Sequence, residues 1–245
     1  MVKFFILMSS TIPKKVFAAI ACLFSFGLYS QSLDGAWEAT MKNEKGINTQ
    51  YVIIISDGYI SEAFFEKKTG KFDGTWGGSF QASNGTFSYV YEFASFDPDL
   101  VGTTKSGTYV FIDGKLKIGD NLWTRIDDGS PGELDGAWLI SGRMRDGKIQ
   151  QRDTDRPRKT MKILSGTRFQ WIAYNTETKQ FMGTGGGTYT SVDGKYTENI
   201  QFFSRDDSRV GASLSFDFEL KDGAWHHSGN SSKGTPIHEI WSKRQ

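Results

Sequence analysis

Glu198, His227 and Glu239 are the side chains of this chain whose types could together do acid–base or ligand chemistry. Carboxylates and an imidazole can exchange protons near neutral pH, and the same groups can hold a polar ligand through hydrogen bonds. The three residues lie on separate segments of the sequence, so they can form one site only if the fold brings those segments together. The elements that could do so follow from an internal repeat.

The chain contains a duplication that predicts two similar domains. The sequence Leu-Asp-Gly-Ala-Trp occurs at 33–37 and again at 134–138, and a longer set of Gly, Phe, Thr and Asp matches follows at a constant offset of 109 positions. A shared period of this kind indicates two copies of one structural unit. We place the copies at 31–128 and 133–245, joined by a polar linker rich in turn residues.

Each copy is predicted to form about eight short strands, because apolar and polar residues alternate between turn signals. The strands are expected near 35–42, 49–56, 60–66, 72–81, 86–95, 105–112, 115–118 and 121–126, and near 136–145, 159–165, 168–174, 181–190, 195–204, 211–220, 225–229 and 237–243. Antiparallel strands without a long helix favour closure into a barrel, which removes exposed edges. We therefore predict an all-β fold of two tandem eight-stranded antiparallel up-and-down barrels.

The first and last strands of each copy share a short pattern. Gly-Ala-Trp stands at 35–37 and 136–138, Trp-Thr-Arg at 123–125, and Trp-Ser-Lys-Arg at 241–244. The pattern resembles lipocalin-like (calycin-type) barrels, and the tandem arrangement is similar to secreted bacterial lipocalin-like domains of unknown function. The resemblance implies that a basic side chain of the last strand packs over the first-strand Trp, with Lys243 in the place of Arg125. It also implies a cup for a small ligand, but no particular chemistry.

A comparison of the two copies predicts which side chains face the cups. The expected inward sets are Phe87, Tyr89, Tyr91 and Phe93 in the first copy and Tyr196, Glu198, Ile200 and Phe202 in the second. Glu198 then replaces an inward Tyr, His227 replaces an Ile, and Glu239 replaces an Asn. Isolated charges are costly to bury unless they are paired or hydrogen-bonded. The substitutions therefore predict a polar pocket in the second barrel.

The predicted ligand-binding residues of that pocket are aromatic or titratable: Trp171, Tyr196, Glu198, Phe202, Trp225, His227 and Glu239. Catalytic residues stay open, with Glu198, His227 and Glu239 as the candidates. In a structural alternative, Glu198 and His227 form a satisfied buried pair and Glu239 lies at a solvated rim. No close His spacing supports a metal site, so neither a metal nor another cofactor is expected. His226 and His238 should point away from the pocket.

The long loop after the first strand of the second copy is rich in basic residues. Arginines and a lysine surround two aspartates there: Arg143, Arg145, Arg152, Arg156, Arg158 and Lys159, with Asp153 and Asp155. This loop is either a solvated lid of mixed charge or a mouth that attracts an anionic ligand, for which arginine is well suited.

The N-terminus has the pattern of an export signal. Basic residues precede an uncharged apolar run at 16–29, which is too short to span a bilayer, so 1–30 is predicted to be a cleaved signal peptide. Cys22 is the single cysteine and offers an alternative lipid-anchor site. We expect a periplasmic or extracellular protein that contacts a membrane only through the signal or such an anchor. The net charge of +1 gives no reason to expect nucleic-acid binding.

The leading functional prediction is an exported protein that binds a small, partly apolar ligand, which could be anionic, in the second barrel. One alternative is a barrel enzyme of lyase, isomerase or hydrolase type that uses Glu198 and His227 for acid–base chemistry. Another is an envelope module that binds other proteins through its outer surface. The sequence leaves open whether the protein is an enzyme, what its ligand is and what its oligomeric state is.

Overall fold

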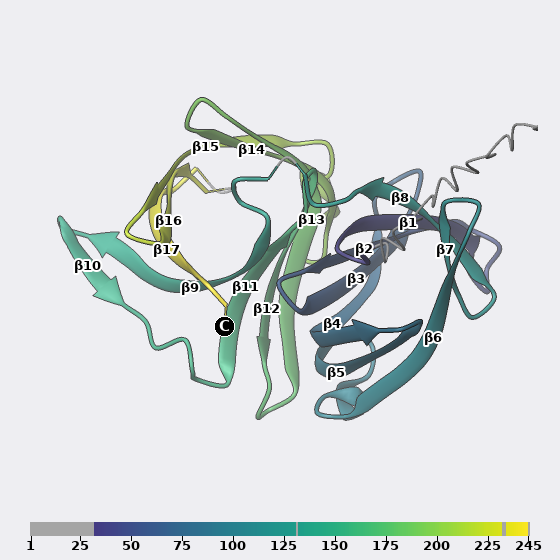
Figure 1. The fold of residues 1–245 in the computed structure, drawn as a ribbon. Helices are drawn as coiled ribbons and strands as arrows, with labels where there is room; N and C mark the ends of the chain where they lie inside the picture. The colour runs from purple at the N-terminus through teal and green to yellow at the C-terminus, as the bar shows by residue number, and fades with distance from the viewer. Residues whose placement is uncertain (1–31, 131, 232–233, 245) are drawn as a thin grey trace, which may run out of the picture. The chain divides into compact units, whose positions relative to one another are not determined.

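The computed structural model describes residues 32–130, 132–231 and 234–244. The predicted signal peptide at 1–30 and the lipid-anchor alternative at Cys22 lie outside these residues. The described chain is all-β, with two closed eight-stranded antiparallel barrels in tandem, which confirms the predicted fold class (Figure 1). Within the described residues, no helix has the length and apolar character needed to cross a membrane.

The first barrel consists of eight strands that pair in chain order, and β8 pairs with β1 to close it. The strands are β1 (Gly35–Lys42), β2 (Asn48–Ser56), β3 (Tyr59–Glu66), β4 (Phe72–Ser83), β5 (Thr86–Ala94), β6 (Thr104–Ile112), β7 (Lys115–Ile118) and β8 (Asn121–Asp127). A short 3-10 turn, η1 (Pro98–Leu100), lies between β5 and β6. Closure gives every strand two neighbours, so the backbone polar groups are satisfied without an exposed edge.

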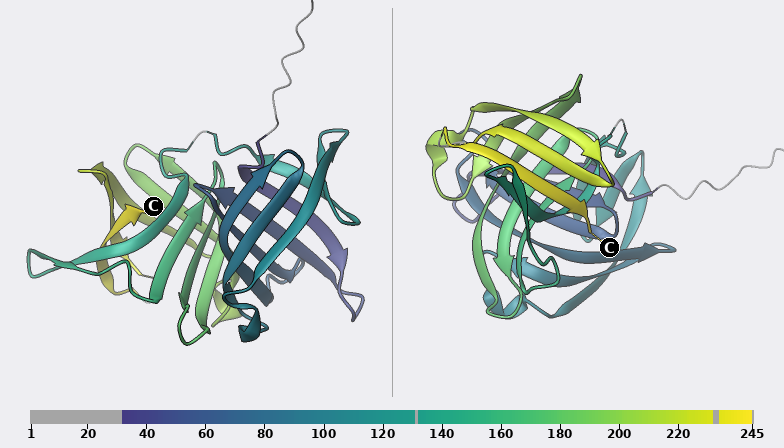
Figure 2. Two further views of the ribbon diagram at one scale, coloured as in Figure 1. Left: turned by 60° about the horizontal axis from the view of Figure 1, so that its bottom comes forward. Right: turned by 90° about the vertical axis from the view of Figure 1, so that its left-hand side faces the viewer.

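The second barrel repeats this plan with one addition. Its strands are β9 (Gly136–Arg145), β10 (Lys148–Gln151), β11 (Arg158–Leu164), β12 (Arg168–Asn175), β13 (Gln180–Val192), β14 (Lys195–Phe203), β15 (Ser213–Lys221), β16 (Ala224–Asn230) and β17 (Pro236–Lys243), with η2 (Asp207–Arg209) after β14. The pairing of β9 with β17 closes the barrel. The sequence did not predict β10, which pairs only with β9 and forms a projecting hairpin with it (Figures 1 and 2).

The tight hairpins form where the sequence predicted turns. Asn84, Asp113, Asp193 and Asp222 each adopt a positive φ and are followed by a glycine that does the same. Asn, Asp and Gly tolerate this backbone conformation better than other residues, which is why such pairs join antiparallel strands.

The first-strand Trp of each barrel has the packing expected from the lipocalin-like pattern. The indole nitrogens of Trp37 and Trp138 donate hydrogen bonds of 2.9 Å to the carbonyls of Leu33 and Leu134. The guanidinium of Arg125 lies 4.0 Å from the Trp37 ring centroid. The Lys243 ammonium lies 4.7 Å from the Trp138 ring in the same way. A cation therefore lies over the first-strand indole in both barrels, Arg in the first and Lys in the second.

One predicted orientation was wrong in both copies. The strand register shifts between Gly77 and Gly78 and between Gly186 and Gly187, and each shift reverses the face of the residues beyond it. Phe93 and Phe202 therefore lie outside the barrels rather than in the cups. A Cβ atom at Gly187 would collide with the backbone of the neighbouring strand, so the irregularity requires glycine.

The outer faces of the two barrels pack against each other. Phe93 contacts Tyr174 with ring centroids 5.0 Å apart, and Phe65 stacks on Phe202 at 5.0 Å. Arg244 of the second barrel pairs with Glu92 of the first at 2.8 Å. Phe93 and Phe202 thus have a structural role between the barrels, and the interiors are left to the remaining inward side chains.

Candidate functional site

The candidate site is a cavity of about 220 Å³ inside the second barrel. Its wall combines aromatic and apolar side chains with a few charged ones: Trp171, Phe203, Phe216 and Trp241 with Arg143, Lys162, Glu198, His227 and Glu239, among others. Strands β9, β11, β12, β14, β15, β16 and β17 all contribute. The cavity therefore depends on closure of the whole barrel.

The most buried charges in the cavity form an ion pair. The ammonium of Lys162 on β11 donates a hydrogen bond of 2.8 Å to Oε1 of Glu198 on β14, and the two side chains are only 5% and 7% exposed. Removing either charge alone would leave the other one buried without a partner. The structural alternative of a Glu198–His227 pair was therefore wrong, because Glu198 pairs with a residue that the sequence analysis did not single out.

A signal for Lys162 was present in the repeat. At the constant offset of 109 positions, Lys162 corresponds to Ile53, which lies in the apolar run Val-Ile-Ile-Ile of the first copy. The predicted pocket rests on a comparison of the later strands, which do not include this position. The same comparison at this strand would have shown a lysine in place of an inward apolar residue.

Aromatic rings surround the ammonium of Lys162. Its nitrogen lies 4.8 Å from the ring centroids of both Tyr196 and Trp225, and 5.3 Å from that of Trp241. The electron-rich faces of these rings attract a cation, and the attraction is strongest where water is excluded. Burial and the negative charge of Glu198 raise the pKa of Tyr196 well above its usual value, so its hydroxyl stays protonated.

His227 lines the same cavity and is 2% exposed. Its Nδ1 atom lies 3.6 Å from Oε2 of Glu239, beyond hydrogen-bonding distance, and neither ring nitrogen has a hydrogen-bond partner within the described part of the chain. Burial and the nearby Lys162 charge lower the pKa of His227. The ring is therefore neutral near pH 7, with one nitrogen able to donate and the other able to accept.

Glu239 lies toward the outer side of the cavity with its side chain 16% exposed. Burial alone would raise its pKa, but His227 and the positive charges of Lys162 and Arg143 together lower it. The Arg143 guanidinium lies 3.5 Å from its Oε1 atom. Glu239 is thus ionised near neutral pH and lies between the neutral imidazole and an arginine of the basic loop.

The structure places the predicted site residues in three groups. Trp171, Glu198, His227 and Glu239 line the cavity. Tyr196 and Trp225 are fully buried in the barrel core, where they support Lys162. Phe202 lies outside the barrel, and Phe203 takes the expected inward place because of the shift in register.

The two remaining histidines lie on the opposite face of their strands. Nδ1 of His226 and Nε2 of His238 are 3.3 Å apart, so the two rings pair with each other across β16 and β17. No group of three or more His, Cys, Asp or Glu side chains that could hold a metal ion occurs among the residues described.

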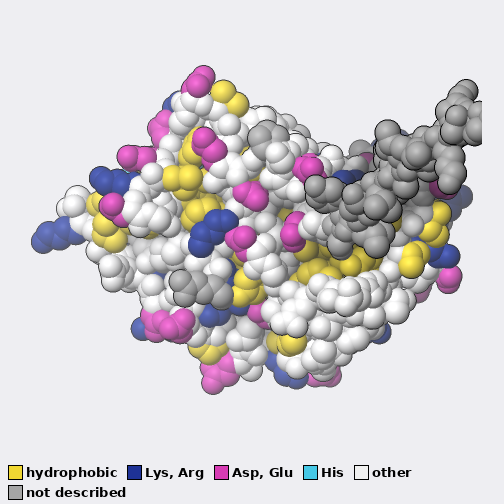
Figure 3. Space-filling view, viewed as in Figure 1, with side chains coloured by type: hydrophobic (Ala, Val, Ile, Leu, Met, Phe, Trp, Pro, Cys, Tyr) yellow, Lys and Arg dark blue, Asp and Glu magenta, His cyan; other side chains and the backbone are white. Residues whose placement is uncertain are grey.

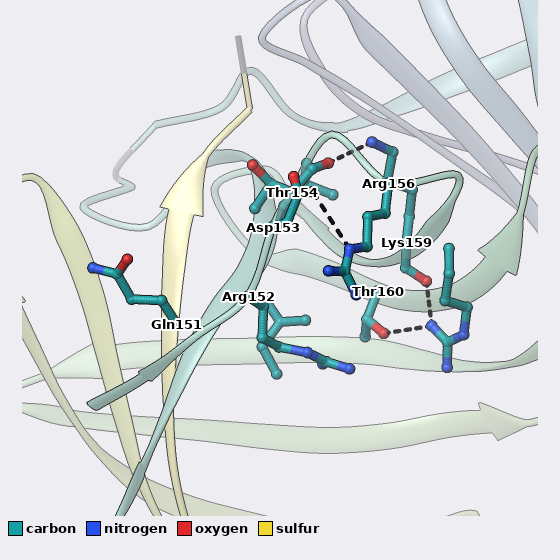
Figure 4. A pocket seen from close by; sticks show the side chains of 10 residues that line it. Gln151, Arg152, Asp153, Thr154, Arg156, Lys159 and Thr160 are labelled. Carbon is teal, nitrogen blue, oxygen red and sulfur yellow. Dashed lines mark hydrogen bonds and ion pairs between the residues drawn. The ribbon is translucent and has the colours of Figure 1, made fainter. Parts of the chain in front are cut away.

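A second pocket of about 230 Å³ lies in the basic loop, and Figure 4 shows the side chains around it. Its wall includes Arg152, Asp153, Arg156, Arg158 and Lys159. Ile140 and Thr160 line both this pocket and the cavity, so the basic pocket adjoins the barrel interior.

Strand β11 connects the two spaces. Arg158, Thr160 and Lys162 alternate along it and therefore project from the same face. Arg158 lines the basic pocket, Thr160 lines both spaces, and Lys162 lines the cavity.

Positive charge exceeds negative charge around the basic pocket. Burial lowers the pKa of Arg158, and the positive charges of Arg152 and Arg205 lower it further. Arg156 pairs with Asp153 at 3.4 Å, with both side chains largely exposed. Figure 3 shows further Lys and Arg side chains over the β9–β10 hairpin. An anion at this pocket would relieve the repulsion among the arginines.

No protein-family model matches the chain, and a search of the curated proteins finds no match. A crystal structure of an uncharacterised protein from Bacteroides eggerthii DSM 20697 is similar to part of it, with 16% sequence identity and a TM-score of 0.30. The match covers 44% of this chain and 98% of that one. The fold itself therefore defines the class of protein, which is a pair of tandem closed barrels. The candidate site is the polar internal cavity of the second barrel.

Proposed function

We propose that the second barrel binds a small, partly apolar molecule that carries an anionic group. The observation that carries the proposal is the cavity of about 220 Å³, whose wall combines aromatic rings with a buried lysine and unpartnered polar atoms. In this interpretation the protein is an exported, lipocalin-like binding protein that acts in the periplasm or outside the cell.

The size and lining of the cavity favour a ligand with one ring or a short chain. A cavity of about 150 Å³ can hold benzene, so this one has room for a ring with a small polar substituent. Trp171, Phe216 and Trp241 supply apolar and aromatic surface for the body of the ligand. Burial of that surface would provide most of the binding free energy.

The polar atoms in the wall favour a hydrogen-bond acceptor on the ligand. The indole nitrogen of Trp241 and the ring nitrogens of His227 are buried without hydrogen-bond partners in the described structure. A carboxylate between these groups and Lys162 would accept from donors that are otherwise unsatisfied. Outside the cavity, Arg152 and Arg158 would attract the same anion and speed its entry.

A direct test measures binding of benzoate and of its uncharged relative benzyl alcohol to the full chain, by tryptophan fluorescence and calorimetry. The double substitution Lys162→Met with Glu198→Gln removes both charges and so avoids a lone buried ion. We expect benzoate to bind more tightly than benzyl alcohol, and the double variant to weaken benzoate binding by about 10-fold or more.

The matched control is Ile53→Met, which introduces the same side chain at the equivalent position of the first barrel and should leave benzoate binding unchanged. Equal affinity for the two probes, or unchanged benzoate affinity in a folded double variant, would contradict an anion-binding cavity.

A second candidate is acid–base catalysis, which the His227–Glu239 arrangement favours. A neutral imidazole beside an ionised carboxylate can act as a general base toward a ligand or water in the cavity. Hydrolysis of p-nitrophenyl acetate offers a first probe of this activity. Turnover that is lost in His227→Gln but kept in the first-barrel control would support catalysis, whereas the same rate in both variants would reject it for this substrate class.

A further inference from the structure

Glu62 is a carboxylate in the interior of the first barrel that the function proposed for the second barrel does not use. Along β3, Ile60 packs into the core of the first barrel, whereas Ala63 and Phe65 pack into the cluster shared with the second barrel. Alternation therefore turns Glu62 inward with Ile60. Its direct cross-strand neighbour is Trp76 on β4.

Glu62 has no cationic partner in the described chain. None of the ion pairs among the described residues includes it. Burial is the main influence on the pKa of its carboxyl and raises it, and only a hydrogen bond with the Trp76 side chain opposes this effect. The second barrel differs, because its inward Glu198 is neutralised by Lys162. A lone carboxylate inside a barrel is costly to keep ionised unless a cation or hydrogen-bond donors balance its charge.

Aromatic side chains gather around Glu62. The Trp76 ring stacks on Tyr89 at 4.6 Å and lies 5.4 Å from Tyr91. The Tyr89 and Tyr91 rings meet edge to face at 5.0 Å, with their hydroxyl oxygens 3.2 Å apart. Tyr51 on β2 packs against the same core cluster as Trp76 and Tyr91, and Glu62 raises its pKa after the larger effect of burial.

Several of these inward side chains are not completely buried. Glu62, Tyr51, Trp76 and Tyr91 are all partly exposed although they face the barrel interior. Phe87, which stacks on Tyr89 at 6.1 Å, also lines an open groove of about 720 Å³ at β4, β5 and β6. The groove lies beside the aromatic cluster, and the partial exposure of Tyr51, Trp76 and Tyr91 leaves ring surface that a ligand could contact.

We propose that Glu62, with Tyr51, Trp76, Tyr89 and Tyr91, forms a second binding site, which takes a small organic ammonium ion. The carboxylate would supply the counter-charge, and the ring faces would attract the cation, most strongly once it has lost its water. A primary amine could also donate a hydrogen bond to Glu62, whereas a quaternary ammonium would bind through charge and ring contact alone.

Binding should strengthen as the pH rises through neutrality. Burial raises the pKa of Glu62 to about 7, so its negative charge develops between about pH 6 and about pH 8. Tyr51 and Tyr89 have pKa values raised above that of a free tyrosine and stay neutral over this range. The Asp73 carboxylate on β4 also raises the pKa of Tyr51. By linkage, a bound cation lowers the pKa of Glu62.

The test compares choline with its uncharged isostere 3,3-dimethyl-1-butanol, by calorimetry on the full chain at about pH 6 and about pH 8. We expect choline to bind more tightly than the isostere and more tightly at the higher pH. Glu62→Gln should weaken choline binding by about 10-fold to 100-fold and remove its pH dependence. Glu44→Gln removes a carboxylate charge from an exposed turn and should change neither the affinity for choline nor its pH dependence.

Equal affinity for choline and the isostere, undiminished choline binding in Glu62→Gln, or no choline binding to the wild-type chain would overturn the proposal. If Glu62→Gln does not fold, Trp76→Phe and Trp76→Leu provide the test, because only the first keeps a ring face. Equal choline affinity in these two variants would also overturn it. The benzoate experiment on the second barrel is independent of all these outcomes.

Discussion

The two barrels share one backbone plan and differ in how they treat charge in the interior. At equivalent positions the first barrel has Ile53 and Tyr89, and the second has Lys162 and Glu198, which form a buried pair. The first barrel instead keeps Glu62, where the second has Trp171. A closed barrel satisfies its backbone through its own strand pairing, so inward side chains can change without loss of the fold. We propose that this difference gives the two copies of one scaffold opposite ligand preferences.

The largest effect is expected from unpairing the buried charges of the second barrel. Lys162→Met alone should lower the free energy of unfolding by about 3–5 kcal/mol, because it leaves Glu198 buried without a cation. Addition of Glu198→Gln should recover a large part of this loss. Denaturant unfolding of both variants measures the effect, and a single variant no less stable than the double one would show that the pair is not electrostatically coupled.

A smaller effect is expected where the barrels meet. Arg244 donates a hydrogen bond of 2.8 Å to the Glu92 carboxylate and one of 3.1 Å to the Tyr174 hydroxyl. Arg244→Met should destabilise the protein by about 2 kcal/mol through loss of charge-assisted hydrogen bonds. Denaturant unfolding of the variant and the wild-type chain measures this change in the free energy of unfolding, and also shows whether unfolding stays a single transition. Unchanged stability would mean that apolar packing alone joins the barrels.

The pH dependence of stability should have opposite signs in the two barrels. Burial raises the folded-state pKa of Glu62 to about 7, so its contribution is fully present below the unfolded pKa and is lost as the pH rises toward 7. Burial lowers the pKa of His227, so its contribution is present above the unfolded pKa and is lost as the pH falls. Denaturant unfolding measured as a function of pH should lose the first trend in Glu62→Gln and the second trend in His227→Phe. If the stability of both variants depended on pH in the same way, the assignment of the two trends to Glu62 and His227 would be wrong.

The smallest effect is expected at a surface pair of the second barrel. Lys195 and Asp217 pair across β14 and β15, with side chains 61% and 64% exposed. Lys195→Ala should change the free energy of unfolding by less than about 1 kcal/mol, because water and salt screen the charges. A loss as large as that of Lys162→Met would mean that burial does not explain the difference between the two ion pairs.

The repeat made the fold predictable to a large extent. Strand alternation, paired turn residues and the Trp motifs each depend on neighbours in sequence, so two closed barrels could be inferred from one chain. The projecting strand β10 and the inverted faces at Phe93 and Phe202 could not be inferred in this way. They depend on register shifts and on contacts between the barrels, which alternation within one strand does not encode.

The candidate site was predicted in part, for a related reason. Glu198, His227 and Glu239 could be found because each replaces a less polar residue of the other copy. Lys162 lies within an apolar strand, and its role becomes evident only when β11 and β14 are brought together across the barrel. The excess of arginine in the basic loop was visible in the sequence, but its position beside the cavity follows from the alternation of Arg158, Thr160 and Lys162 along β11.

The most direct test of a ligand site built on the buried Lys162–Glu198 pair is native mass spectrometry of the protein recovered from its own host. The experiment compares the wild-type chain with the Lys162→Met, Glu198→Gln double variant. We expect the wild-type protein to carry a small co-purified molecule with an acidic group, and the folded double variant to lack it. A ligand-free wild-type protein that also fails to bind benzoate, or a molecule retained equally by both proteins, would contradict a ligand site built on the buried pair.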